Sequence, residues 1–243
     1  MPSHPNPPQS HHCAAAMSDT EPKLCAVFIR LLESADRLSR SHTAVDYRGA
    51  VARCTAAASA AGRIRGALGA CLRSRADLLR CECLLHLRNL VACADAACAA
   101  WEYAIAAGEV NVLIMTLTKC SQVAQEAPEE MAEVMNRRKV DTHRGDPWWV
   151  DHTARPLRLA LGFGMASVAV CECACAGAVS PELHAKAIGN LGSCLNSLHE
   201  QPQKSMLLHR RAVTLCRRAV QEADPGADGP RRVLRSCLGS LGH

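Results

Sequence analysis

Apolar positions recur at helical spacing along most of the chain. Between Leu24 and Leu38, the sequence LCAVFIRLLESADRL places apolar side chains on one face of a helix. From Asp46 to about Ala127, almost every stretch fits the same period, and the glycines at 62, 66, 69 and 108 mark the expected breaks. The pattern predicts a series of consecutive amphipathic helices.

This pattern is interrupted between residues 128 and 156 by three prolines, a Gly-Asp-Pro turn and the adjacent pair Trp148 and Trp149. We expect part helix and part long connection here, with the two indoles either capping the first helical block or anchoring a partner. The predicted organisation is a disordered tail (1–22), a helical block with a weaker repeat pattern (23–127), a connection (128–156) and a helical block with a clearer repeat (157–243).

Composition decides the fold class. Hydrophobic residues make up 49 % of the chain, but aromatic residues make up only 3 %. All-β sandwiches and barrels draw on aromatic and β-branched side chains, whereas the apolar residues here are mainly Ala, Leu, Val and Cys. Because Ala and Leu favour helices and small side chains let helix axes approach closely, we expect an all-α protein.

Two short patterns recur along the helices. One is a small residue followed by a larger one at i+4 and an alanine at i+7, which together form one helix face suited to close packing. Its copies are Ala50-Cys54-Ala57, Ala97-Trp101-Ala104 and Ser205-His209-Ala212. The other is a Leu-Gly pair at 68–69, 191–192 and 238–239. Glycine within a helix costs about 1 kcal/mol relative to alanine, so its recurrence predicts close backbone approach.

The tripeptide Asn190-Leu191-Gly192, followed by the copy of the first pattern that starts at Ser205, resembles the tetratricopeptide repeat over about residues 181–242. In that family, Leu-Gly lies on the first helix of each pair and small-x-x-x-aromatic-x-x-Ala on the second. The helices here are longer than the standard unit and are similar to the elongated repeats of kinesin light-chain type. The resemblance implies an irregular α-solenoid of antiparallel helix pairs that binds a peptide or helix of another protein.

Ligands of that family bind in the concave groove formed by the first helices. Applied to the helix that starts at Pro181, the resemblance places Lys186, Asn190, Ser193 and Ser197 on the groove face. A lysine and an asparagine one turn apart could bind a peptide backbone or a carboxylate. These four residues are the candidate peptide-binding site; the alternative is an ordinary polar helix surface.

The net charge of +5 is concentrated at the C-terminal end. From Gln201 onward there are eight basic residues and three acidic residues, including the pairs Arg210-Arg211 and Arg217-Arg218. This excess favours an acidic protein or peptide partner. The arginines lack interleaved aromatic residues, so we expect no specific nucleic-acid binding.

The fifteen cysteines include two dense clusters, Cys81-Glu-Cys83 and Cys171-Glu-Cys173-Ala-Cys175. A closed zinc site needs four ligands and typically uses C-x₂₋₄-C pairs on turns, and the sequence contains no C-x-x-C. The favoured interpretation is that these cysteines are small buried apolar residues. The alternative is a metal- or redox-responsive helical protein in which the two clusters converge.

No assembled catalytic motif is present, so we expect no enzyme activity and no cofactor. The stretch Gly162–Ser167 begins like a nucleotide-binding loop, but it lies within an apolar helical run and follows no strand. The N-terminal residues contain no apolar leader segment. We therefore expect a cytoplasmic protein without a membrane span.

Overall fold

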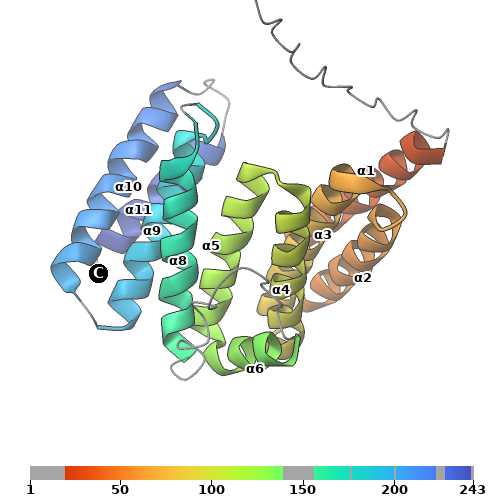
Figure 1. Ribbon diagram of the computed structural model, residues 1–243, viewed down its shortest axis with the longest axis horizontal. Helices are drawn as coiled ribbons and strands as arrows, with labels where there is room; N and C mark the ends of the chain where they lie inside the picture. The colour runs from red at the N-terminus through yellow and green to blue at the C-terminus, as the bar shows by residue number, and fades with distance from the viewer. Residues whose placement is uncertain (1–19, 139–155, 176, 200, 223–227, 242–243) are drawn as a thin grey trace, which may run out of the picture.

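The computed structural model describes residues 20–138, 156–175, 177–199, 201–222 and 228–241. Within these ranges all regular structure is α-helical, as the composition predicts (Figure 1). Trp148, Trp149 and most of the N-terminal tail lie outside the described residues. The described helices are α1 (Thr20–Ser39), α2 (Ala44–Ala61), α3 (Gly66–His86), α4 (Leu90–Ala107), α5 (Val110–Glu126), α6 (Pro128–Arg138), α8 (Pro156–Cys173), α9 (Pro181–Ser197), α10 (Pro202–Glu222) and α11 (Asp228–Leu241).

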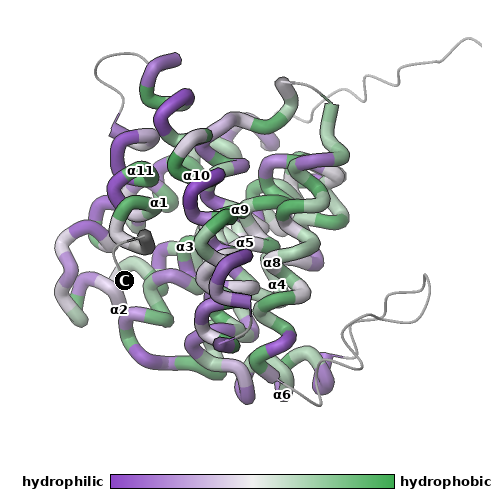
Figure 2. Tube along the Cα trace, turned by 90° about the vertical axis from the view of Figure 1, so that its left-hand side faces the viewer, coloured by the Kyte–Doolittle hydropathy of each residue, from purple (hydrophilic) through white to green (hydrophobic). Residues whose placement is uncertain are grey.

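The helices form antiparallel pairs that stack side by side. The pairs are α1 with α2, α3 with α4, α5 with α8 and α9 with α10, and α11 packs at the end. The first helix of each pair also packs on the first helix of the next. We therefore call α1, α3, α5, α9 and α11 the inner helices, and α2, α4, α8 and α10 the outer helices. In Figure 1, α4 and α8 lie toward the viewer, and α3 and α11 lie behind them. Figure 2, turned by 90°, shows α4 and α8 to the right of α11.

This arrangement is an irregular α-solenoid. Each outer helix packs on the two inner helices that flank it in the chain, and α6 is inserted between α5 and α8, where it packs on both and on α4. Stacking of helix pairs, each in contact mainly with its neighbours, is what defines such a fold. Because α5 pairs with α8, helices from before and after residues 128–156 share one apolar core. In this core the ring of Phe163 of α8 lies edge-on to that of Trp101 of α4, at a centroid distance of 5.3 Å.

The predicted small-large-alanine pattern lies on outer helices. Its three copies are on α2, α4 and α10, and all of their residues are buried. The pattern therefore marks the face by which an outer helix packs against the inner helices. The physical reason is the small size of the residues at i and i+7, which lets the helices approach closely.

One such close approach joins α9 and α10. A Cβ atom added at Gly192 would lie 2.9 Å from Nε2 of His209, and Ser205 Oγ donates a hydrogen bond of 2.8 Å to the Gly192 carbonyl. The prediction of close backbone approach is confirmed at this Leu-Gly pair. The glycine is required because the imidazole occupies the space of its missing side chain.

The other two Leu-Gly pairs have different environments. A Cβ added at Gly69 would lie 2.0 Å from the carbonyl oxygen of Ile64, so this glycine makes room for the turn before α3 and not for a partner helix. Nothing lies within 4 Å of a Cβ added at Gly239. The prediction of close backbone approach is therefore confirmed at Gly69, where the neighbouring backbone belongs to the preceding turn, and wrong at Gly239, which lies on an open helix face.

Two helices, Leu90–Ala107 and Pro156–Cys173, are long and apolar enough to cross a membrane by length and composition. Both lie within the stack: α4 packs on α3, α5 and α6, and α8 packs on α5, α6 and α9. This packing buries 50 % of Leu90–Ala107 and 39 % of Pro156–Cys173, so it accounts for part of their apolar character.

Replacing Gly192 with alanine should lower the stability of the protein. The new methyl group would push against the buried His209 ring, and overpacking of this kind costs about 1–3 kcal/mol. We expect the midpoint of urea unfolding to fall. Gly239→Ala is the matched control on an open face and should be neutral or stabilising by up to about 1 kcal/mol. Equal effects of the two substitutions would contradict the close α9–α10 contact.

The buried imidazole of His209 should make stability depend on pH. Burial lowers the pKa of His209 from its ordinary value of 6.5. As the pH falls through 6.5, the unfolded chain therefore takes up a proton before the folded chain does, and the free energy of unfolding decreases.

Urea titrations between pH 7.5 and 5 measure how the free energy of unfolding changes with pH, and His209→Gln should reduce this change. Part of the pH dependence that remains comes from His184, whose pKa is also lowered, first by burial and then by Arg211. An unchanged slope in the His209→Gln variant would exclude the proposed contribution.

Candidate functional site: the inner-helix groove

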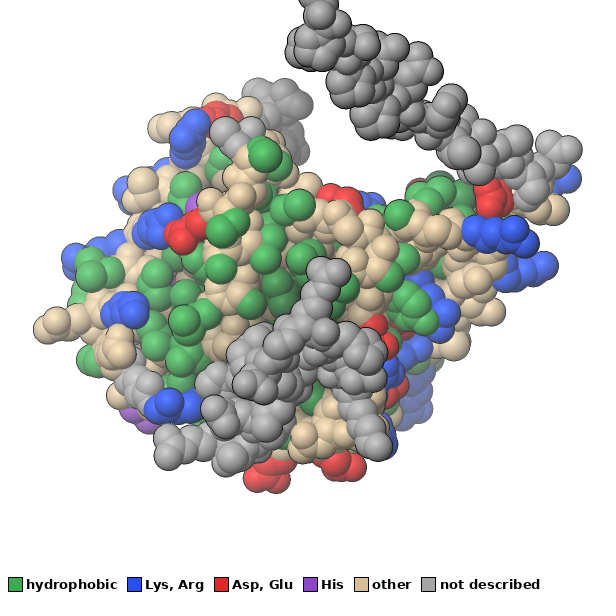
Figure 3. All heavy atoms as spheres, viewed as in Figure 1, with side chains coloured by type: hydrophobic (Ala, Val, Ile, Leu, Met, Phe, Trp, Pro, Cys, Tyr) green, Lys and Arg blue, Asp and Glu red, His purple; other side chains and the backbone are tan. Residues whose placement is uncertain are grey.

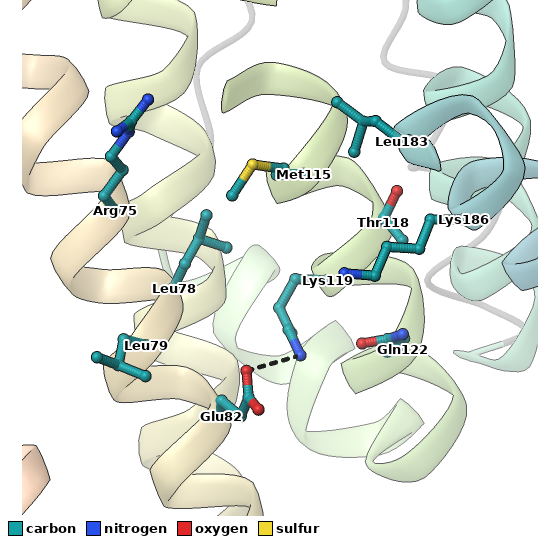
Figure 4. A pocket seen from close by; sticks show the side chains of 10 residues that line it. All are labelled: Arg75, Leu78, Leu79, Glu82, Met115, Thr118, Lys119, Gln122, Leu183 and Lys186. Carbon is teal, nitrogen blue, oxygen red and sulfur yellow. Dashed lines mark ion pairs between the residues drawn. The ribbon is translucent and has the colours of Figure 1, made fainter. Parts of the chain in front are cut away.

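A continuous groove runs along the inner helices. Between α3, α5 and α9 it forms a cavity of about 420 Å³, and it continues between α1 and α3 and along α5 and α9. Helices α3, α5 and α9 supply residues of successive turns to its walls (Figure 4). The residues that line the central part are Arg75, Leu78, Leu79, Glu82, Met115, Thr118, Lys119, Gln122, Leu183 and Lys186.

Apolar side chains form much of the groove surface. Met115 is 41 % exposed at its centre, and Ile29 is 50 % exposed at the α1 end. Leu72 and Leu79 connect these two places along α3. Exposed apolar surface within a concave site is typical of a binding surface.

Basic side chains cross the centre of the groove. Lys119 of α5 forms an ion pair of 3.6 Å with Glu82 of α3 (Figure 4). Arg75 and Lys186 form no ion pair with any residue that the structure describes. Glu33 and Asp36 line the α1 end, where Asp36 is paired with Arg40. The groove is therefore basic at its centre and acidic at one end.

The four residues predicted for peptide binding are in different environments. Lys186 lines the groove and extends from α9 toward α5 in Figure 4. Asn190 is 9 % exposed and accepts a hydrogen bond of 3.3 Å from Gln125 of α5. Ser193 donates to the carbonyl of Gly189 in its own helix, and Ser197 is exposed near the end of α9. The structure thus brings Lys186 together with Arg75 and Lys119, and it does not bring the other three residues there.

The two cysteine clusters are separate in the structure. Cys81 packs against Cys93 with a sulfur–sulfur distance of 3.4 Å, whereas Cys83 lies in a different apolar cluster beside Cys54. Cys171 belongs to the core around α8, α9 and α10. Among the described residues, no group of three or more Cys, His, Asp or Glu side chains could hold a metal ion.

Most of the described cysteines have the properties of core residues. Desolvation raises the pKa of Cys54 and of Cys98 to about 12 in each case. A thiol with such a pKa carries little of the reactive thiolate form at neutral pH. Cys173 and Cys175 are instead exposed, at and just beyond the end of α8.

The basic pairs of α10 lie on the surface of the molecule. Arg211 pairs with Glu172 at 3.0 Å and Arg218 pairs with Glu222 within the same helix. On the face that carries α8 and α10, basic side chains are scattered among hydrophobic and acidic ones (Figure 3).

Exposed apolar side chains also occur outside the groove. Leu157 and Met165 of α8 have exposed fractions of 41 % and 57 %.

No protein-family model matches the chain, and a search of curated proteins gives no significant match. Among solved structures, the chain is similar to the crystal structure of BtubC (BKLC) from P. vanneervenii, with 14 % sequence identity over 87 % of this chain and 96 % of that chain. The TM-score of 0.31 is too low to support an argument about fold or function. The helical-repeat architecture therefore follows from the helix packing described above.

Cys173 and Cys175 should be the described cysteines that react first with a thiol reagent, since they are exposed while Cys54 and Cys98 are buried. Labelling of native, freshly reduced protein with Ellman's reagent measures this. The variant Cys173→Ser/Cys175→Ser should lose two fast-reacting thiols, whereas Cys54→Ser/Cys98→Ser should lose none. Fast labelling of Cys54 or Cys98 in the folded protein would contradict the packing.

Proposed function

We propose that this protein is a non-catalytic interaction scaffold and that the inner-helix groove binds an amphipathic peptide or helix carrying acidic residues. The observation that supports this most directly is the combination of exposed apolar side chains with two unpaired cations inside one concave surface. Met115 supplies an apolar contact, and Arg75 and Lys186 supply the charge.

The apolar and charged residues have different roles in this proposal. Burial of Met115 and its apolar neighbours supplies affinity, at about 25 cal/mol per Å² of apolar surface removed from water. Arg75 and Lys186 select acidic partners and orient them, because charge complementarity contributes to specificity and association rate more than to affinity. Glu82 already forms an ion pair with Lys119 in the groove, so a carboxylate of the bound peptide would compete with Glu82 for Lys119.

A peptide selection tests the proposal. A random-sequence peptide library displayed on phage is panned against the full chain, and enriched peptides are synthesised and titrated by fluorescence anisotropy. We expect peptides with acidic residues beside large apolar ones, and affinities that fall as the salt concentration rises.

Met115→Gln should weaken the binding of such a peptide about tenfold, equivalent to about 1.4 kcal/mol, because it replaces an apolar groove side chain by a polar one without changing the charge. Met165→Gln is the matched control, since Met165 is an exposed methionine on the outer helix α8. Lys186→Glu should also weaken binding, and Lys204→Glu, on the exposed surface of α10, should not. If the groove and control variants behave alike, the groove is not the binding surface.

A further inference from the structure

A second cavity lies on the opposite face of α3, between the outer helices α2 and α4. It has a volume of about 560 Å³, and Arg138 of α6 is among the residues that line it. Small residues on both sides keep it open: Ala58, Ser59 and Gly62 on the α2 side and Ala99 on α4. We call it the arginine pocket, because Arg63, Arg73, Arg80 and Arg138 all line it.

Arg73 is held by an aromatic ring and forms no ion pair with the residues that the structure describes. Its guanidinium lies 4.3 Å from the centroid of the Tyr103 ring, and its Nε is buried with no hydrogen-bond partner. No ion pair joins Arg73 to any residue that the structure describes, while its Nη1 lies close enough that a Cβ added at Gly62 would be 3.3 Å away. Stacking on an aromatic ring fixes the plane of a guanidinium and leaves its edge free to bind an anion.

Arg80 lies on the same face of α3, seven residues after Arg73. Its Nη1 is 3.3 Å from the carboxylate of Asp77. Asp77 lies between the two arginines on this face of α3, and its side chain is almost fully buried. The Nε of Arg80 is also buried without a partner. One buried carboxylate therefore faces two guanidinium groups, and only one of them is within ion-pair distance.

The remaining acids of the pocket are already engaged. Arg138 donates to Asp95 at 2.9 and 3.0 Å and to Glu102 at 3.0 and 3.1 Å. Arg63 is exposed and has no ion pair among the described residues. The pocket lining therefore holds four arginines against three acids, a net excess of one positive charge, and Arg63 and Arg73 are the two arginines without an ion pair to a described residue.

We infer that the arginine pocket binds a phosphoryl oxyanion between Arg73 and Arg80. A phosphoryl group has several acceptor oxygens, which can receive charge-assisted hydrogen bonds from two planar guanidinium groups at once. Arg63 can close over the anion from the loop between α2 and α3. The site is independent of the proposed groove function, because Arg73, Asp77 and Arg80 face away from the groove residues Arg75, Leu79 and Glu82 of the same helix.

Isothermal titration calorimetry of the full chain with inorganic phosphate, at constant ionic strength, tests the inference. We expect saturable binding at one site, and Arg73→Gln should weaken it about tenfold or more through loss of charge-assisted hydrogen bonds. Arg73 forms no ion pair with a described residue, and Asp77 keeps its ion pair with Arg80 in this variant; circular dichroism checks that the variant is folded. Arg65→Gln, an exposed arginine outside the pocket, is the matched control and should bind phosphate like the wild type.

Heats that do not saturate, or equal affinities of the Arg73→Gln and wild-type proteins, would overturn the inference. A second variant, Arg80→Gln/Asp77→Asn, removes both partners of the buried ion pair together, and its affinity for phosphate should also fall. Titration with phosphoserine and with a peptide that contains it distinguishes the source: tighter binding of the peptide supports a phosphorylated protein, and equal affinities support a small phosphorylated molecule. Groove variants such as Met115→Gln report on the peptide only, so failure of one proposal is distinguishable from failure of the other.

Discussion

Close contact between inner and outer helices through small residues is the constraint on which this structure depends. Gly192 accepts the His209 ring against its backbone, and Ser205 reaches the Gly192 carbonyl at 2.8 Å. The same kind of contact recurs where Ser121 of α5 donates to the Ala160 carbonyl of α8 at 2.7 Å. A hydroxyl can reach a helical carbonyl of a neighbour only if the two helix axes are close. The positions of the outer helices determine how the inner helices stack. The stacked inner helices form the groove.

Much of the fold could be predicted from the sequence because its signals are local. Helical periodicity and the scarcity of aromatic residues predict an all-α chain, and the pattern at Ala97, Trp101 and Ala104 correctly identifies a closely packed helix face. The Leu-Gly pair is a weaker signal, since glycine serves three different purposes at positions 69, 192 and 239. Sequence spacing alone cannot distinguish a tight turn, a close helix contact and an open face.

The candidate site was less predictable, for a geometric reason. Lys186 and Asn190 lie one turn apart on α9, but α5 packs against the second of them, and Gln125 bonds to it. Which turn of an inner helix faces the groove depends on how neighbouring helices cross, and this is a property of the whole stack. Arg75 and Lys119 were missed because α3 and α5 do not carry the full repeat pattern. Their signal was indirect: α4 carries the outer-helix pattern, so the preceding helix had to be an inner one.

The proposed function places partners on the inner helices. The most direct measurement is hydrogen–deuterium exchange, followed by mass spectrometry, with and without a peptide selected on the full chain. Bound peptide should slow exchange in α3, α5 and the first turns of α9, which carry Arg75, Met115 and Lys186, and leave the outer helices α4 and α8 unchanged. Protection confined to α4, α8 or α10 would contradict the account.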